Sequence, residues 1–72
     1  MDRPFEFFVY LIESYAEHRG REPSSVLEEL KKKNCTSFVF DMYEMYHSEA
    51  IENAFRDIDA LLTTGHPLAD DV

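Results

Sequence analysis

The apolar residues of the chain recur at the three- and four-residue spacing of amphipathic helices, not at the alternating spacing of half-buried strands. Residues with turn or capping propensity, among them Gly20, Asn34 and Gly65, separate the apolar segments. We therefore predict an all-α protein, a compact bundle of four short helices at approximately residues 4–19, 25–33, 37–46 and 49–63.

The first segment is apolar around more than one side. Its main stripe runs at helical spacing from Phe5 to Ala16, and a second apolar set, Phe7, Tyr10 and Leu11, lies around the helix from it. A helix with this pattern either runs through the centre of a fold or turns part of its surface toward a partner.

The third segment has two interpretations. Phe38-Val39-Phe40 alone is typical of a buried strand. The polar residues favour a helix, because a helix gathers them on one stripe whereas a strand would scatter them over both faces. They are Ser37, Asp41, Glu44 and Ser48. No second strand-like segment is present to pair with it, so we predict a helix.

Hydroxyl side chains stand where three of these helices are expected to begin. Ser25 and Glu28 have the spacing of a capping box, in which each side chain bonds the other's backbone N–H. Thr36 or Ser37 is expected to cap the third helix, and Ser48 the fourth.

The length and composition indicate one domain, at residues 1–65, followed by a frayed acidic tail at 66–72. A chain of this size buries only about 60% of its unfolded surface, so its stability alone is marginal. One cysteine excludes an internal disulfide and is typical of a reducing compartment. The longest apolar run, at residues 7–12, is shorter than the roughly 20 residues of a membrane span. The first residues lack the cationic region of a signal peptide. We expect a cytoplasmic protein that does not enter membranes.

The formal net charge of −8 is divided unevenly. Residues 1–34 hold six basic and seven acidic side chains, whereas residues 35–72 hold one basic residue, Arg56, and eight acidic ones. Phosphate groups repel such a surface, so nucleic acid is not an expected partner. Lys31, Lys32 and Lys33 form a short run at a predicted helix C-terminus, where they compensate the helix dipole. A basic protein is compatible with this charge, although acidic surfaces more often serve solubility.

Two groups of residues could carry chemistry. Asp41, Glu44 and His47 follow one another at three-residue spacing, and Glu-x-x-His is half of the carboxylate-bridged metal motif of helical bundles. The sequence offers no second such pair, so a solvated helix face is the favoured interpretation. Cys35 precedes a predicted helix, where a thiolate is stabilised, but a lone cysteine is usually an apolar filler. The alternative hypothesis is a small metal- or thiol-dependent enzyme that uses these residues. We expect neither an enzymatic activity nor a bound metal or other cofactor.

The six Phe and four Tyr exceed what a core of this length is expected to bury. Tyrosines are amphipathic and low in conformational entropy, which makes them typical interface residues. The alternative is that they cover a small core with their hydroxyl groups in water. The candidate interaction face comprises Phe7, Tyr10, Leu11, Phe40, Tyr43 and Tyr46.

Two stretches resemble a known family. The stretch from Phe7 to Ala16, Phe-Phe-Val-Tyr-Leu-Ile-Glu-Ser-Tyr-Ala, is similar to the opening of a family of short bacterial proteins classed as domain of unknown function 3791. Tyr43-Glu44-Met45-Tyr46-His47, followed by Asp57-Ile58-Asp59, is similar to its second block. The family usually has Thr after the His, where this chain has Ser48.

The resemblance implies a binding partner, and the family has no established activity. Members of the family tend to be encoded beside toxin-like genes, which implies an antitoxin or a toxin-associated protein. Together with the residues, this leads us to expect a non-enzymatic protein-interaction module, which binds another protein (such as a toxin-like one encoded nearby), a second copy of itself, or both.

Overall fold

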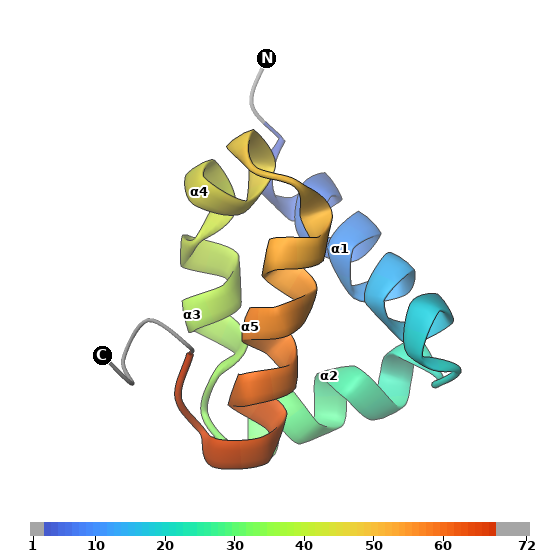
Figure 1. Cartoon of the computed structure of the whole chain (residues 1–72). Helices are drawn as coiled ribbons and strands as arrows, with labels where there is room; N and C mark the ends of the chain where they lie inside the picture. Colours follow the sequence, from blue (N-terminus) through green and yellow to red (C-terminus); the bar gives the residue numbers. More distant parts are fainter. Residues whose placement is uncertain (1–2, 68–72) are drawn as a thin grey trace.

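The computed structural model describes residues 3–67, and within this range it contains five helices and no strand. They are α1 (Pro4–Arg19), α2 (Pro23–Lys32), α3 (Thr36–Asp41), α4 (Tyr43–Ser48) and α5 (Ile51–Thr64) (Figure 1). The predicted all-α bundle is confirmed. The first helix has the predicted bounds. The second and the last begin and end one or two residues from the predicted positions, and the third is divided in two.

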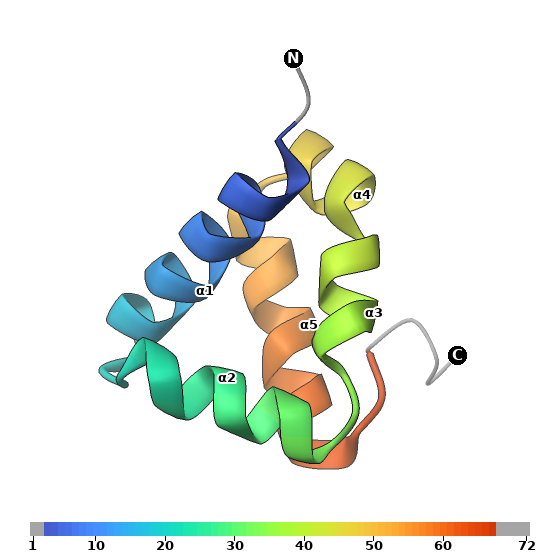
Figure 2. The same ribbon diagram turned by 180° about the vertical axis from the view of Figure 1, so that it is seen from behind.

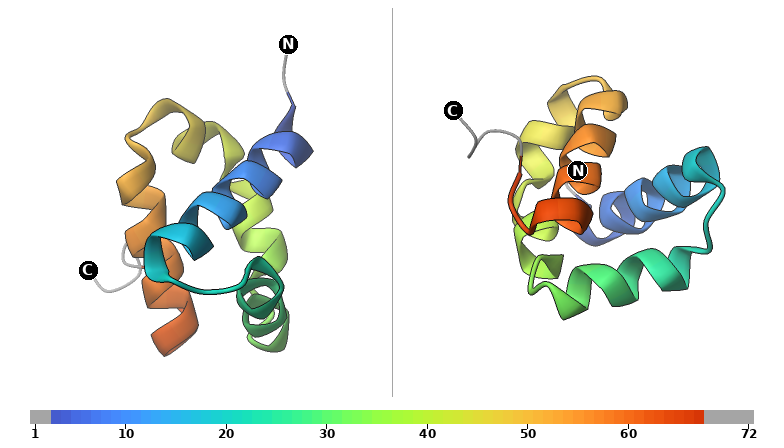
Figure 3. Two further views of the ribbon diagram at one scale, coloured as in Figure 1. Left: turned by 90° about the vertical axis from the view of Figure 1, so that its right-hand side faces the viewer. Right: turned by 60° about the horizontal axis from the view of Figure 1, so that its bottom comes forward.

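The helices surround one core. Seen from behind in Figure 2, α1, α2 and the α3–α4 segment form the sides of a triangle, and α5 lies behind its centre. The short α1–α2 connection lies at one edge of the molecule, away from α5 (Figure 3). All five helices contribute to the core, which also includes Cys35 between α2 and α3; its buried apolar members are Leu11, Ile12, Tyr15, Ala16, Val26, Leu30, Cys35, Val39, Tyr46, Ala54, Phe55, Ile58 and Leu61.

Three helices end at residues with left-handed backbone, as their sequence predicts. Gly20 and Gly65 have φ of 68° and 82°, values that glycine adopts without steric cost. Asn34 has φ of 59°, and the Cys35 N–H after it donates to the Leu30 carbonyl at 2.8 Å. Asparagine tolerates this conformation better than most residues, which explains its position at the end of α2.

The third predicted helix is divided at Met42, which has φ of −83° and ψ of 15°. Its N–H still donates to the Phe38 and Val39 carbonyls, so the chain bends without losing its hydrogen bonding. Both α3 and α4 contact α1. The bend therefore keeps both halves of the segment against the same helix, where a single helix at 37–46 was predicted.

The predicted side-chain caps are wrong. Helix α2 begins at Pro23, whose missing N–H suits the first helical position, and the Ser25 N–H donates to the Glu22 carbonyl inside the first turn. Neither Thr36 nor Ser37 caps α3, because Cys35 precedes its first residue. Ser48 ends α4 instead of capping α5, and its hydroxyl donates to the Met45 carbonyl.

The last two described residues follow α5 closely. The Thr64 hydroxyl and the His66 backbone bond each other at 3.1 Å, and Pro67 is buried. The rest of the predicted tail, residues 68–72, lies outside the described residues.

A polar cluster joins α1 to α5. Asp59 accepts hydrogen bonds from the Tyr15 hydroxyl at 2.5 Å and from Arg19 Nε and Nη2 at 3.1 and 2.6 Å. The hydrogen bonds from Arg19 lower the pKa of Asp59, and burial together with the bond to Asp59 raises the pKa of Tyr15 to about 12. The Arg19 guanidinium also lies over the rings of Tyr15 and Phe55. We call Tyr15, Arg19 and Asp59 the α1–α5 clamp.

A second polar contact joins α4 to α5. The Tyr46 hydroxyl donates to Asp57 Oδ2 at 2.8 Å, and burial raises the pKa of Tyr46 well above its ordinary value. On the other side of the molecule, Arg21 bonds the Glu29 carboxylate and the Ser25 hydroxyl, which ties the α1–α2 connection to α2.

Candidate interaction surfaces

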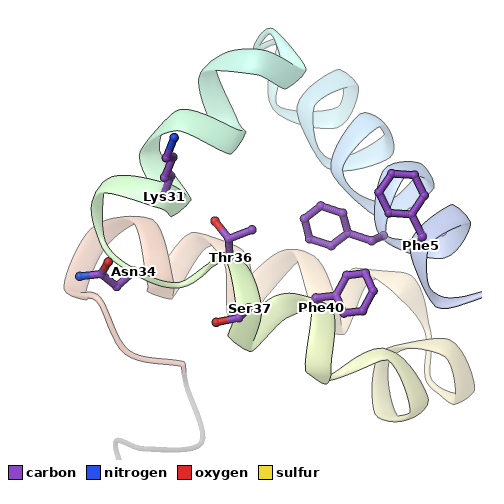
Figure 4. A pocket seen from close by; sticks show the side chains of 7 residues that line it. Phe5, Lys31, Asn34, Thr36, Ser37 and Phe40 are labelled. Atoms are coloured by element: carbon purple, nitrogen blue, oxygen red, sulfur yellow. The ribbon is translucent and has the colours of Figure 1, made fainter.

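An apolar groove lies between the beginning of α1, the end of α2 and α3 (Figure 4). Its volume is about 510 Å³. Three phenylalanine side chains and four polar ones line it; we call it the phenylalanine groove, and its residues are Phe5, Phe8, Lys31, Asn34, Thr36, Ser37 and Phe40.

The phenylalanines come from two helices. Phe5 and Phe8 lie on successive turns of α1, and the rings of Phe8 and Phe40 are in tilted contact with their centroids 5.7 Å apart. Phe8 packs against the core, whereas Phe5 is 67% exposed and Phe40 is 37% exposed. The core therefore fixes one ring, and two other rings face solvent beside it.

The polar lining residues lie at one end of the groove. Among the described residues that line the groove, Lys31 is the only charged one, and it belongs to the last turn of α2. Asn34 and Ser37 are exposed, and the buried hydroxyl oxygen of Thr36 has no hydrogen-bond partner within the described part of the chain. The side chains at this end can donate hydrogen bonds to a ligand, whereas the three phenylalanine rings offer only apolar contacts.

A second, shallower pocket lies between α1 and α4. Its volume is about 290 Å³, and we call it the aromatic pocket; its lining residues are Arg3, Glu6, Phe7, Tyr10, Tyr43 and His47. The two pockets share no lining residue.

The rings of the aromatic pocket contact one another across the two helices. Phe7 meets Tyr43 and His47 edge to face, with centroid distances of 5.5 and 5.6 Å. Tyr43 and His47 lie 5.2 Å apart at a shallow angle, and Tyr10, which is 57% exposed, lies 6.3 Å from Phe7. These are the offset and edge-to-face arrangements that aromatic rings prefer.

The candidate face predicted from the sequence is only partly a surface. Leu11 and Tyr46 lie in the core at 1% and 2% exposure, so their assignment to the face is wrong. The periodicity placed both on an apolar stripe, but it could not show that other helices cover them. Phe7, Tyr10 and Tyr43 meet in the aromatic pocket, whereas Phe40 belongs to the phenylalanine groove.

The sequence interpretation missed the other members of the groove. Phe5 was assigned to the main stripe of α1, and the lysine run was explained by the helix dipole alone. Phe5 lies inside that stripe, between Ile12 and Ala16 around the helix, so the spacing gave no signal of its exposure. It is exposed although Ile12 and Ala16 are buried.

The residues of the alternative, chemical hypothesis are divided between α3, α4 and the α2–α3 connection. The bend at Met42 places Asp41 on α3 and both Glu44 and His47 on α4. Among residues 3–67, no group of three or more His, Cys, Asp or Glu side chains is placed to hold a metal ion. Cys35 is buried, and its thiol donates to the Lys33 carbonyl.

Comparison with known proteins identifies the family of the chain. A family model described as a protein of unknown function (DUF3791) matches residues 6–64. The chain belongs to this family. The match extends from the first turn of α1 to the last residue of α5. No curated protein matches the chain, and no solved structure does.

The family description names no activity, so the function has to be argued from the surfaces of this member. Its longest described helix, α1, has 16 residues, and none of the described helices is both long and apolar enough to cross a membrane.

Proposed function

We propose that this DUF3791 protein is a non-enzymatic protein-interaction module that holds an apolar side chain of its partner in the phenylalanine groove. The observation that carries the proposal is the exposure of Phe5 and Phe40 beside the packed ring of Phe8. Apolar side chains gathered in a hollow of the surface are typical of protein-binding sites.

The size of the chain gives a physical reason for such a contact. Full burial of a phenylalanine side chain is worth about 1.5–3 kcal/mol, and Phe5 retains most of its surface for a partner to cover. The Phe8 ring, held by the core, preorganises one wall of the groove and reduces the entropy lost on binding. The single charged lining residue, Lys31, favours a partner segment with a carboxylate near its apolar anchor.

The partner is proposed to be a different protein rather than a second copy of the chain. Each copy carries a formal charge of −8, so two copies repel one another. The family resemblance favours a toxin-like protein encoded nearby, for which this chain acts as antitoxin or associated subunit. The lone cysteine favours the cytoplasm as the place where it acts.

Co-expression of the chain with the product of the adjacent gene, followed by co-purification and calorimetry, tests the proposal. We expect a complex whose affinity falls about ten-fold or more in Phe5→Ser and in Phe40→Ser, because each removes part of a central apolar contact. Met45→Ser is the matched control, since Met45 is 50% exposed on α4 and lines neither pocket.

Thermal unfolding of each variant shows whether it is folded. Equal affinities for the wild type and both phenylalanine variants would refute the role of the groove. Failure of the adjacent gene product to bind would refute the choice of partner. A dimer in size-exclusion chromatography with light scattering, lost in Phe5→Ser, would replace that partner with a second copy of the chain.

A further inference from the structure

The aromatic pocket differs from the phenylalanine groove in the kind of side chain that it suits. Four rings from two helices, those of Phe7, Tyr10, Tyr43 and His47, line it together with the side chains of Arg3 and Glu6. The face of an aromatic ring carries partial negative charge, so it attracts cations, and tyrosine rings do so well. A carboxylate at the edge of such rings adds an ionic partner for the same cation.

The surface around the pocket is acidic. Glu6, Tyr10, Glu13 and Glu17 recur at helical spacing along the solvent side of α1, and all four are exposed. Neither Glu13 nor Glu17 forms an ion pair with another described residue, and the exposed Glu44 next to Tyr43 forms none either. A cation that approaches this face is therefore attracted before it reaches the rings.

The chain places one guanidinium of its own at the pocket. Arg3 Nη1 lies 2.9 Å from Glu6 Oε2, and both side chains are mostly exposed. An exposed ion pair of this kind contributes little to stability, so a competing guanidinium can replace it. Arg3 thus shows the contact that Glu6 makes, and it also competes for that contact.

We propose that the aromatic pocket binds an arginine side chain of a basic protein partner. The guanidinium stacks on the exposed ring of Tyr10, reaches the Glu6 carboxylate in place of Arg3, and lies beside Tyr43. Arginine suits the pocket better than lysine because its planar group stacks on a ring and bonds a carboxylate through two N–H groups at once. This is a second binding site beyond the proposed groove, and it does not depend on it.

A peptide of alternating glycine and arginine is the probe. The full chain, labelled with ¹⁵N, is titrated with it at pH 8 and followed by NMR, in parallel with the lysine peptide and with the uncharged citrulline peptide. We expect saturable shifts centred on Tyr10, Tyr43 and Glu6, with arginine binding more tightly than lysine and citrulline binding not at all. Shifts of equal size over all acidic parts of the surface would overturn the proposal, because they would report only non-specific attraction.

Four variants form two pairs with equal changes of charge. Glu6→Gln is expected to weaken binding of the arginine peptide about two- to five-fold. Its control, Glu52→Gln, removes an exposed carboxylate of α5 that lies outside the pocket. Arg3→Ala is expected to strengthen binding because it removes the competitor, and its control, Arg56→Ala, removes an exposed cation of α5. Equal effects within either pair would overturn the proposal.

Tyrosine variants separate stacking from charge. Tyr10→Ala is expected to weaken binding about two- to five-fold, and Tyr10→Phe is expected to keep most of it because the ring remains. Unchanged binding in Tyr10→Ala would contradict the proposed stacking. Phe40→Ser, which changes the phenylalanine groove and not the aromatic pocket, is expected to leave arginine binding unchanged, so failure of the groove and failure of the pocket give different results.

Discussion

Replacement of Asp59 by alanine is expected to loosen the contact between α1 and α5. In the α1–α5 clamp, Asp59 is the acceptor for the Tyr15 hydroxyl and for two nitrogens of Arg19. These are the polar contacts that hold two helices whose sequence positions are 40 to 44 residues apart. The alanine variant removes all three hydrogen bonds and leaves both donors in place.

Tyr15 and Arg19 contribute differently to the loss of unfolding free energy. Tyr15 is only 3% exposed, so its hydroxyl loses an acceptor in a largely buried position, which costs about 1–3 kcal/mol. The side chains of Arg19 and Asp59 are 32% and 43% exposed, so solvent screens their ion pair and its loss adds little. We therefore expect Asp59→Ala to lower the free energy of unfolding by about 2 kcal/mol. For a chain of this size, each kcal/mol lowers Tm by about 4–8 °C.

Urea and thermal unfolding, followed by circular dichroism, measure this change. Asp59→Asn should cost about half as much, because its amide oxygen still accepts from Tyr15 while the charge is lost. Tyr15→Phe combined with Asp59→Ala completes a double-mutant cycle, in which we expect a coupling energy of about 1 kcal/mol. A loss below about 0.5 kcal/mol in Asp59→Ala, or strict additivity in the cycle, would refute the clamp as a stabilising contact.

The pH dependence provides an independent check with a definite sign. The pKa of Asp59 is lower in the folded chain than in the unfolded one, mainly because of the hydrogen bonds from Arg19. Its contribution to stability is therefore complete above the ordinary aspartate pKa of about 3.9 and is lost as the pH falls through the folded value. The difference in stability between wild type and Asp59→Ala should close at low pH, and a constant difference would contradict the charged clamp.

Three further predictions concern the fold. Ile58→Ala, at a fully buried position on α5, should lower the free energy of unfolding by about 2–5 kcal/mol in urea titrations, and a cost below 1 kcal/mol would show that the core collapses around the site. Because the pKa of Tyr15 is raised to about 12, its neutral form stabilises the fold fully below pH 10 and this contribution is lost as the pH rises toward 12, so Tm should fall over that range, and by less in Tyr15→Phe. Gly65→Ala should cost about 1 kcal/mol, since nothing surrounds the position but its φ of 82° is unfavourable for alanine, and an unchanged Tm would show that the backbone relaxes there.

The helices could be predicted because their signals are local. Apolar spacing placed α1 within its observed bounds, and Gly20, Asn34 and Gly65 marked three helix ends. The predicted cap of α2 was wrong for another local reason. Pro23 is the first residue of α2, so Ser25 lies inside the helix and not before it. The bend at Met42 has no such signal, because no glycine or proline stands there; it lies where α3 and α4 both contact α1.

The binding surfaces were harder to predict because exposure depends on which helices meet. Spacing alone assigns Leu11 and Phe7 to the same apolar set, yet one lies in the core and the other in the aromatic pocket. Tyr46 resembles Tyr43 in sequence context, but the Tyr46 hydroxyl bonds Asp57 on α5, whereas Tyr43 lines the aromatic pocket. The lining of the groove combines residues 5 and 40, whose proximity no local pattern reports.

The two aspartates of α5 have a consequence for how that helix is held. Asp57 and Asp59 flank the buried Ile58, and they bond tyrosines that come from opposite neighbours, Tyr46 on α4 and Tyr15 on α1. Aliphatic packing alone tolerates a small rotation of a helix about its own axis, but opposed hydrogen bonds on the two sides of its buried stripe do not. The Asp-Ile-Asp triplet therefore fixes the rotation of α5 about its own axis. Core residues can then be replaced by apolar residues of another shape while α5 keeps its orientation.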